Sequence, residues 1–196
     1  MTETVLLSDP RIAAVPIREC REPLVDLRTV GPLLIDPHRS GPDGAYAHVR
    51  TGVVDRLVTA QSLLRRNLRL LIIEGYRPAA VQEQYLQECY NRLRAAHPEW
   101  SGGEIQDAAA ELVLPPHVAG HVAGAAVDLT LAEGDGAELA MDGQAEGRTH
   151  RALLSSALRA AGFVSDPARW WHWSYGDRYW TFVTGHTSAR YGPVGE

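Results

Sequence analysis

The clearest helical pattern in the chain lies between residues 51 and 66. Apolar residues recur there every three to four positions, which places them on one face of a helix: Val53, Val54, Leu57, Val58 and Leu64. Residues 148–161 have the same amphipathic spacing and end at a glycine. Two more helices are expected, one from the turn at residue 78 to about 96 and one over 103–113.

Short apolar runs between these helices predict strands. LRLLII (68–73), AAVDLTL (125–131) and WWHWSY (170–175) are the strongest, and 25–28 and 32–36 are weaker strand-like pieces. SGPDG (40–44) has the composition of a flexible loop. The strands and helices do not alternate regularly, which favours an α+β fold with helices packed on a small, mostly antiparallel sheet. A single domain spanning 1–196 is the simplest organisation at this length.

Composition excludes several classes of protein. Hydrophobic residues make up 45% and charged residues 22%, which is typical of a folded globular domain rather than a disordered one. No apolar run is long enough for a membrane helix, and the N-terminus lacks the pattern of a signal peptide, so we expect a cytoplasmic protein without a membrane partner. A net charge of −5 argues against nucleic acid as a partner, and two cysteines give no disulfide framework. The oligomeric state stays open.

Two segments carry candidate chemistry. HVAGAAVD begins at His121 and ends at Asp128, and RWWH ends at His172. Two imidazoles and one carboxylate form a ligand set that suits a catalytic Zn²⁺ with an open fourth position. Spacing alone is a weak indication, because histidines and aspartates in a chain of this size are often structural. His117 lies four residues before His121, but the surrounding prolines and glycines disfavour a helical two-histidine motif.

These motifs resemble those of the zinc D-Ala-D-Ala dipeptidases, the vancomycin-resistance dipeptidase family. HVAGAAVDLTL is similar to the family signature His-x-x-Gly-x-Ala-x-Asp, EGYRP (74–78) to its Asp-Gly-Tyr-Arg-Pro turn, and 161–180 to its Glu-Trp-Trp-His segment. The resemblance extends from about residue 15 to 194. It implies an α+β zinc-peptidase fold, a zinc cofactor and activity on a small peptide-like substrate. It also implies that His121, Asp128 and His172 hold the metal and that Arg77 stabilises the oxyanion that forms on the scissile carbonyl.

The chain departs from the family at the residue three before the last histidine. The family has a glutamate there, which carries the proton of the metal-bound water, whereas this chain has Arg169. Arginine does not act as a general base near neutral pH, because its pKa exceeds about 12. Two smaller departures are Ala119, in place of a serine, and a rearranged stretch that contains Asp142.

Three hypotheses follow from Arg169. In the first hypothesis, the protein is still a zinc dipeptidase and another group replaces the base. The candidates for this group are Asp166, Asp177, His150 and His117. Alternatively, the zinc scaffold serves a transfer or cyclisation reaction on a peptide-derived substrate, and Arg169 binds an anionic group. In the third hypothesis the protein is a zinc-binding pseudoenzyme. Loss of a placed proton carrier costs about 10²–10⁴-fold in rate, so efficient dipeptide hydrolysis is not expected.

The substrate-binding residues follow from the size and charge of a free dipeptide. We expect a small pocket that is polar at the metal end and walled by Trp171 or Trp173, with Tyr46 as a further lining residue. A dipeptide carries one ammonium and one carboxylate, so the pocket is expected to offer one charge of each sign. Asp142 is the candidate partner of the ammonium, and Arg169 is expected to face the pocket.

Overall fold

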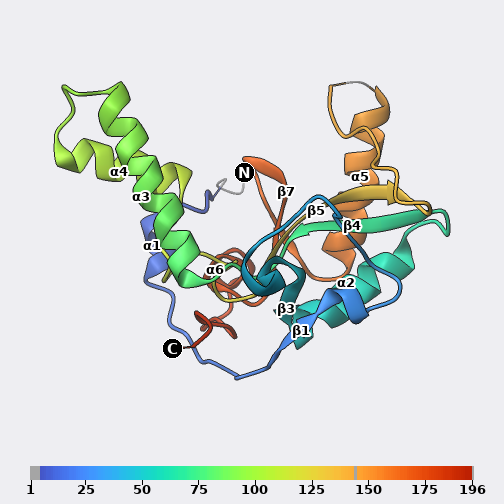
Figure 1. Ribbon diagram of the computed structural model, residues 1–196. Coiled ribbons are helices and arrows are strands. Elements are labelled where there is room, and N and C mark those ends of the chain that lie inside the picture. Colours follow the sequence, from blue (N-terminus) through green and yellow to red (C-terminus); the bar gives the residue numbers. More distant parts are fainter. Residues whose placement is uncertain (1–4, 144, 196) are drawn as a thin grey trace.

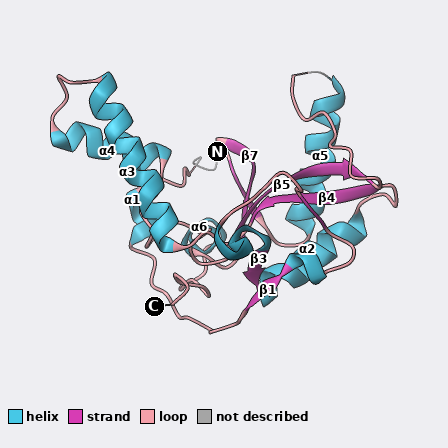
Figure 2. Cartoon of the chain, in the orientation of Figure 1, coloured by secondary structure: helices cyan, strands magenta, loops and turns pink. Residues whose placement is uncertain are grey.

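A computed structural model describes residues 5–143 and 145–195 (Figures 1 and 2). The helices are α1 (Pro10–Ala13), α2 (Thr51–Leu63), α3 (Ala79–Ala96), α4 (Gly102–Leu112), α5 (Ala145–Ala160) and α6 (Arg178–Thr184). The strands are β1 (Leu24–Asp26), β2 (Leu34–Ile35), β3 (His48–Arg50), β4 (Leu68–Glu74), β5 (Ala126–Glu133), β6 (Val164–Asp166) and β7 (Arg169–Ser174). Short 3₁₀ helices span Leu27–Thr29 and Pro42–Ala47.

The principal sheet has five strands in the order β2-β4-β5-β7-β6. Only β2 runs parallel to its neighbour, and the other three pairings are antiparallel. β1 and β3 form a separate antiparallel pair. The expected α+β fold with a mostly antiparallel sheet is therefore confirmed.

One face of this sheet is covered by α2 and α5, which contact each other; in Figure 1, α2 lies below the strands and α5 runs down behind them. The alternation of side chains along β5 sends Val127, Leu129 and Leu131 into the same core as Leu57 of α2 and Leu158 of α5. All five side chains are fully buried. This packing holds β5 in place and determines which of its residues face the opposite side of the sheet.

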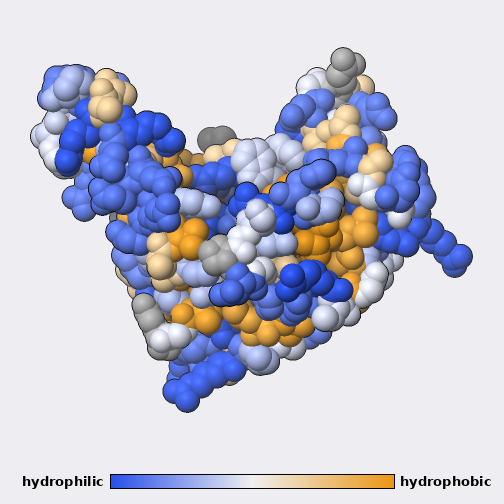
Figure 3. Space-filling model, in the orientation of Figure 1, coloured by the Kyte–Doolittle hydropathy of each residue, from blue (hydrophilic) through white to orange (hydrophobic). Residues whose placement is uncertain are grey.

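The opposite face of the sheet carries the polar residues. Because Asp128 lies between Val127 and Leu129, its side chain points away from the core. Glu74 of β4 and His172 of β7 are its cross-strand neighbours, so three polar side chains lie in a row over three adjacent strands. The α3–α4 pair projects from the body on one side of this face, and the beginning of α5 projects on the other (Figure 1). Figure 3 shows that both projections are mostly hydrophilic.

Several sequence-based boundaries differ from the structure. The helix expected over 51–66 ends at Leu63, and the segment expected as a flexible loop over 40–44 enters a 3₁₀ helix at Pro42. The strand expected over 25–28 ends at Asp26, because the Asp26 side chain accepts the Arg28 amide and starts a 3₁₀ turn. β3, β6, α1 and α6 are short elements without a readable apolar period, and the pattern did not predict them. No helix in the described ranges has both the length and the apolar character needed to cross a bilayer.

Gly75 is the point where β4 turns toward the polar face. Its amide donates to the Tyr46 carbonyl at 2.6 Å, and a Cβ there would overlap the His48 carbonyl oxygen and lie 2.7 Å from Val49 Cγ1. We expect Gly75→Ala to lower the free energy of unfolding by about 1–3 kcal/mol, because the backbone must shift to relieve this overlap. Urea unfolding measures the effect. Gly31→Ala is the matched control, since no atom lies within 4 Å of its Cβ position, and it is expected to stay within about 0.5 kcal/mol of the parent. Equal stability of the two variants would contradict the prediction.

Candidate metal centre

His121, Asp128 and His172 meet at the polar face of the sheet. The Asp128 Oδ1 atom lies 3.3 Å from His121 Nε2 and 2.8 Å from His172 Nδ1. One candidate ligand atom from each residue falls within 4.8 Å of the others. Asp128 and His172 are paired across β5 and β7, whereas His121 comes from the turn that precedes β5. The structure thus brings together the three residues that the sequence proposed as ligands.

The turn that carries His121 is shaped by Gly124, whose φ of +64° is a left-handed conformation. The Gly124 amide donates back to the His121 carbonyl at 3.0 Å, which closes the turn. Arg50 stabilises the same turn from another segment of the chain, because its Nε donates to the Ala123 carbonyl at 2.8 Å. Arg50 is buried, and sequence reasoning missed it because its partner is 73 positions away.

The hydrogen bonds of His121 determine its tautomer. His121 Nδ1 lies 2.6 Å from the Gly75 carbonyl oxygen, which can only accept, so Nδ1 carries the proton. The Nε2 lone pair is therefore directed toward Asp128. Burial alone would lower the pKa of His121, but the Asp128 carboxylate outweighs it and raises that pKa. In the same way, burial opposes ionisation of Asp128, yet the two imidazoles hold the pKa of Asp128 well below its usual range.

The donor set fits a tetrahedral metal ion. Ligand atoms about 2.0–2.1 Å from a tetrahedral Zn²⁺ lie about 3.3–3.4 Å from one another. The 3.3 Å between Asp128 Oδ1 and His121 Nε2 matches this spacing, and the 2.8 Å between Asp128 Oδ1 and His172 Nδ1 is shorter. Two neutral imidazoles and one carboxylate leave a fourth position open, as in catalytic zinc sites. The Gly75 carbonyl fixes the ring of His121 in the way that outer-shell acceptors orient metal ligands.

Arg77 lies beside this cluster and is held rigidly. Its Nε and Nη2 donate to the two oxygens of Glu74, each at 2.8 Å, and its Nη1 donates to Gln82 Oε1 at 2.7 Å. Arg39 also donates to Glu74. Burial would raise the pKa of Glu74, but the hydrogen bond from Arg77 together with the positive charges of His121, Arg77 and Arg39 outweighs it, so the pKa falls and Glu74 is a carboxylate. Sequence reasoning did not assign Glu74, although its place directly before the Gly-Tyr-Arg-Pro turn was the available signal.

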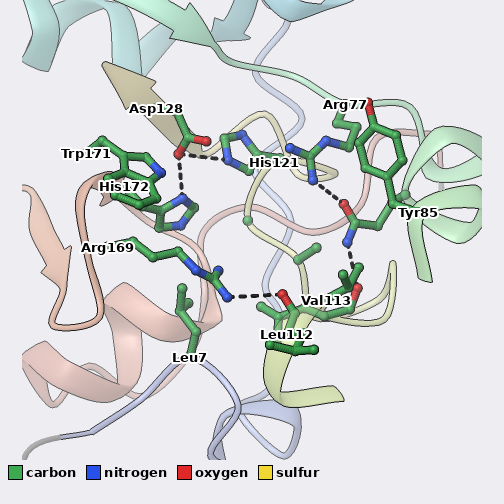
Figure 4. A pocket seen from close by; sticks show the side chains of 14 residues that line it. Leu7, Arg77, Tyr85, Leu112, Val113, His121, Asp128, Arg169, Trp171 and His172 are labelled. Atoms are coloured by element: carbon green, nitrogen blue, oxygen red, sulfur yellow. Dashed lines mark hydrogen bonds and ion pairs between the residues drawn. The ribbon is translucent and has the colours of Figure 1, made fainter. Parts of the chain in front are cut away.

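A pocket of about 270 Å³ opens over the cluster (Figure 4). Its polar end is formed by His121, Asp128, His172 and Arg77, and the remaining wall includes Arg169 and Trp171. Arg169 reaches across the pocket, where its Nη2 donates to the Leu112 carbonyl at 3.1 Å. The expectations that Arg169 faces the pocket and that Trp171 walls it agree with this arrangement.

Two residues proposed for substrate binding are not part of this pocket. Asp142 is an exposed residue that precedes α5, is paired with Arg151 at 2.7 Å and does not line the pocket. Tyr46 lies in the 3₁₀ helix before β3 and does not line the pocket, although its backbone supports Gly75. Trp173, the alternative wall residue, is buried in the core beneath the sheet.

The candidates for a replacement base also lie outside the pocket wall. Asp166 is buried behind Arg169 and accepts the Ala168 amide, while His117 is exposed. His150 is on α5, and its Nδ1 lies 2.9 Å from the Ala140 carbonyl oxygen. Asp177 is buried at the N-terminus of α6, where it accepts the Trp180 amide, and burial raises its pKa. None of the four lines the pocket, so none is placed to deprotonate a water there.

Comparison with known proteins finds one curated relative in sequence and several solved structures of similar fold. No family model matches the chain. It is 26% identical to a D-alanyl-D-alanine dipeptidase from Synechocystis sp., over 86% of this chain and 88% of the relative. The LdcB L,D-carboxypeptidase, which is 18% identical, superposes with a TM-score of 0.50 over 85% of this chain and 76% of its own. The vancomycin-resistance D,D-pentapeptidase VanY, solved with Zn(II), is 18% identical, with a TM-score of 0.45 over 77% of this chain and 85% of its own.

Proposed function

We propose that this chain, a relative of the D-alanyl-D-alanine dipeptidases, is a zinc-dependent, peptidase-like enzyme that acts on the amide bond of a small peptide-like substrate. The observation that carries the proposal is the meeting of His121, Asp128 and His172 on the floor of a pocket whose polar end also contains Arg77. A bound Zn²⁺ supplies Lewis acidity and lowers the pKa of a bound water. His121, Asp128 and His172 would hold the ion, and three protein ligands are the number typical of a catalytic zinc site.

Arg77 is the residue proposed to stabilise negative charge on the scissile oxygen. Three of its five N–H groups are occupied by Glu74 and Gln82, which fixes the plane of the guanidinium. A pre-oriented cation in a partly dry site stabilises a developing oxyanion without reorganisation. Glu74 and Gln82 are accordingly positioning residues for Arg77.

Proton transfer is the step for which the pocket is poorly equipped. Among the described residues that line it, Asp128 is the one carboxylate, and its Oδ1 faces both metal-ligand histidines. We therefore propose that hydrolysis is slow, by about 10²–10⁴-fold relative to an enzyme with a placed general base. The extension of Arg169 across the pocket favours a second candidate function, a transfer or cyclisation reaction on an anionic peptide-derived substrate that needs no such base.

Turnover of D-Ala-D-Ala by the zinc-loaded protein tests the proposed function. We expect hydrolysis that depends on zinc and that is 10²–10⁴-fold slower than that of a dipeptidase relative with a glutamate base, measured side by side. Arg77→Ala is expected to lower kcat by a further 10²–10³-fold, because one oxyanion donor is lost. Arg94→Ala, an exposed arginine on α3, is the control and is expected to be neutral. Zinc-independent turnover, or an active Arg77→Ala variant, would overturn the assignment.

A cytoplasmic location and a single-domain organisation over 1–196 stay predictions. Fractionation of the host cell and limited proteolysis of the purified chain test them.

A further inference from the structure

Positively charged side chains outnumber negatively charged ones in the pocket wall. Within the described part of the chain, the pocket wall has two guanidiniums, on Arg77 and Arg169, and one carboxylate, on Asp128. Asp128 is the proposed metal ligand and lies between two imidazoles. Glu74 and Asp166 are buried behind the two arginines, with side chains 8% and 2% exposed, and Asp177 is likewise buried. Among the described residues, the pocket wall therefore offers a ligand two guanidiniums and no carboxylate besides the proposed metal ligand.

Arg169 has capacity for an anion. Its Nε lies 3.8 Å from Asp166 Oδ2, which is beyond hydrogen-bond distance, and Nη2 donates to the Leu112 carbonyl. Among residues 5–143 and 145–195, no other hydrogen-bond acceptor pairs with its planar guanidinium, and its side chain is 32% exposed within the pocket wall. A guanidinium of this type binds a carboxylate through two parallel hydrogen bonds.

An apolar wall adjoins Arg169. Leu112, Val113 and Leu114 follow one another at the end of α4, and Leu7 of the N-terminal segment lies on the same side of the pocket (Figure 4). Leu112 is 51% exposed. A single exposed leucine is ordinary, but four apolar residues beside a partly unpaired guanidinium form a surface suited to an acyl group next to a carboxylate.

We propose that the pocket takes N-acyl amino acids, which carry a carboxylate and an apolar acyl group but no ammonium, in preference to zwitterionic dipeptides. Arg169 binds the carboxylate, and the wall of Leu7, Leu112, Val113 and Leu114 receives the acyl group. The ammonium of a free dipeptide is disfavoured by the two guanidiniums and gains no compensating carboxylate. This inference rests on the proposed function, because it concerns the substrate of the same metal site.

A matched pair of ligands tests the preference directly. N-propionyl-D-alanine differs from D-Ala-D-Ala only in the replacement of the ammonium by hydrogen. We expect calorimetry to show that zinc-loaded protein binds the propionyl compound at least about tenfold more tightly. Arg169→Gln is expected to weaken that binding by about 10–100-fold, whereas Arg148→Gln, an exposed arginine on α5, is expected to leave it unchanged. Equal or tighter binding of the dipeptide, or a preference untouched by Arg169→Gln, overturns the inference.

The apolar wall is tested by lengthening the acyl group. N-hexanoyl-D-alanine is expected to bind at least about fivefold more tightly than the propionyl compound, because the longer chain covers the leucines. Leu112→Asn is expected to reduce this gain, and Leu63→Asn, an equally exposed leucine that lies outside the pocket, is expected to preserve it. A gain that survives Leu112→Asn overturns the placement of the acyl group.

The failures of the two proposals are distinguishable. Elemental analysis and zinc-dependent hydrolysis report on the metal enzyme, and ligand calorimetry repeated after chelation reports on the pocket without the ion. Bound zinc together with preferred binding of the dipeptide overturns the present inference and leaves the proposed function standing. Preferred binding of the propionyl compound by a chain that holds no zinc supports the inference about the pocket and overturns the metal enzyme.

Discussion

His121→Ala is expected to reduce bound zinc from about one ion per chain to nearly none. The variant removes one of three proposed ligands, and it removes the one whose ring is fixed by the Gly75 carbonyl. A site with two remaining ligands loses both a bond and the orientation that makes the bond favourable, so the zinc dissociation constant is expected to rise by at least about 10³-fold. Elemental analysis after dialysis, followed by titration with a competing chelator, measures both quantities.

His117→Ala is the matched control. It changes a histidine of the same HVAGH segment that is exposed and lies outside the candidate ligand cluster. Its zinc content and unfolding curve are expected to equal those of the parent. Full zinc stoichiometry in His121→Ala, or loss of zinc in His117→Ala, would show that the metal lies elsewhere.

Arg169→Glu is expected to raise hydrolysis of D-Ala-D-Ala by about 10²–10⁴-fold. Arg169 lines the pocket that contains the proposed metal ligands, so a carboxylate at this position can take a proton from a water held there. Asp166 lies 3.8 Å from Arg169 Nε and is buried, and a neighbouring carboxylate of this kind raises the pKa of the new glutamate toward the working range of a general base. The same change is expected to abolish binding of N-propionyl-D-alanine, because like charges replace an ion pair.

Two further variants separate the effect of a base from the effect of charge. Arg169→Gln removes the guanidinium without adding a base, and we expect no gain in hydrolysis from it. Arg148→Glu makes the same charge change on the exposed face of α5 and is expected to be silent. Zinc content and urea unfolding are measured for each variant to confirm that the fold and the metal are retained. A correctly folded, zinc-loaded Arg169→Glu variant without increased turnover would overturn the role assigned to this position.

Local patterns predicted the parts of the fold that depend on neighbours in sequence. The apolar period of α2 and the alternation of β5 reflect faces that pack on one core, and both were readable. The boundaries were less accurate, because tertiary contacts and side-chain caps set them. Asp26 illustrates this, since its carboxylate ends β1 through a hydrogen bond that strand propensity does not describe.

The candidate site was only partly readable for the same reason. The candidate ligand triad followed from motifs, because those residues lie in short, characteristic segments. Arg50 and Arg39 support the site through contacts between segments distant in sequence, which no local pattern records. Glu74 lies only three residues before Arg77, so its role was within reach of the local motif. Asp142 was proposed from an uncertain motif match, and in the structure its carboxylate pairs with Arg151 on the solvent side of α5.

The proposed metal site and the proposed substrate wall lie on different parts of the fold. The row of Glu74, Asp128 and His172 belongs to the sheet. The row is set by strand register, and a shift of one residue in β5 would turn Asp128 into the core. The apolar wall at 112–114 belongs instead to the end of α4 and the segment after it, outside the sheet. We therefore expect substitutions in this segment to change which ligands bind without disturbing strand pairing. Related chains could then differ in substrate while they share the same proposed metal site.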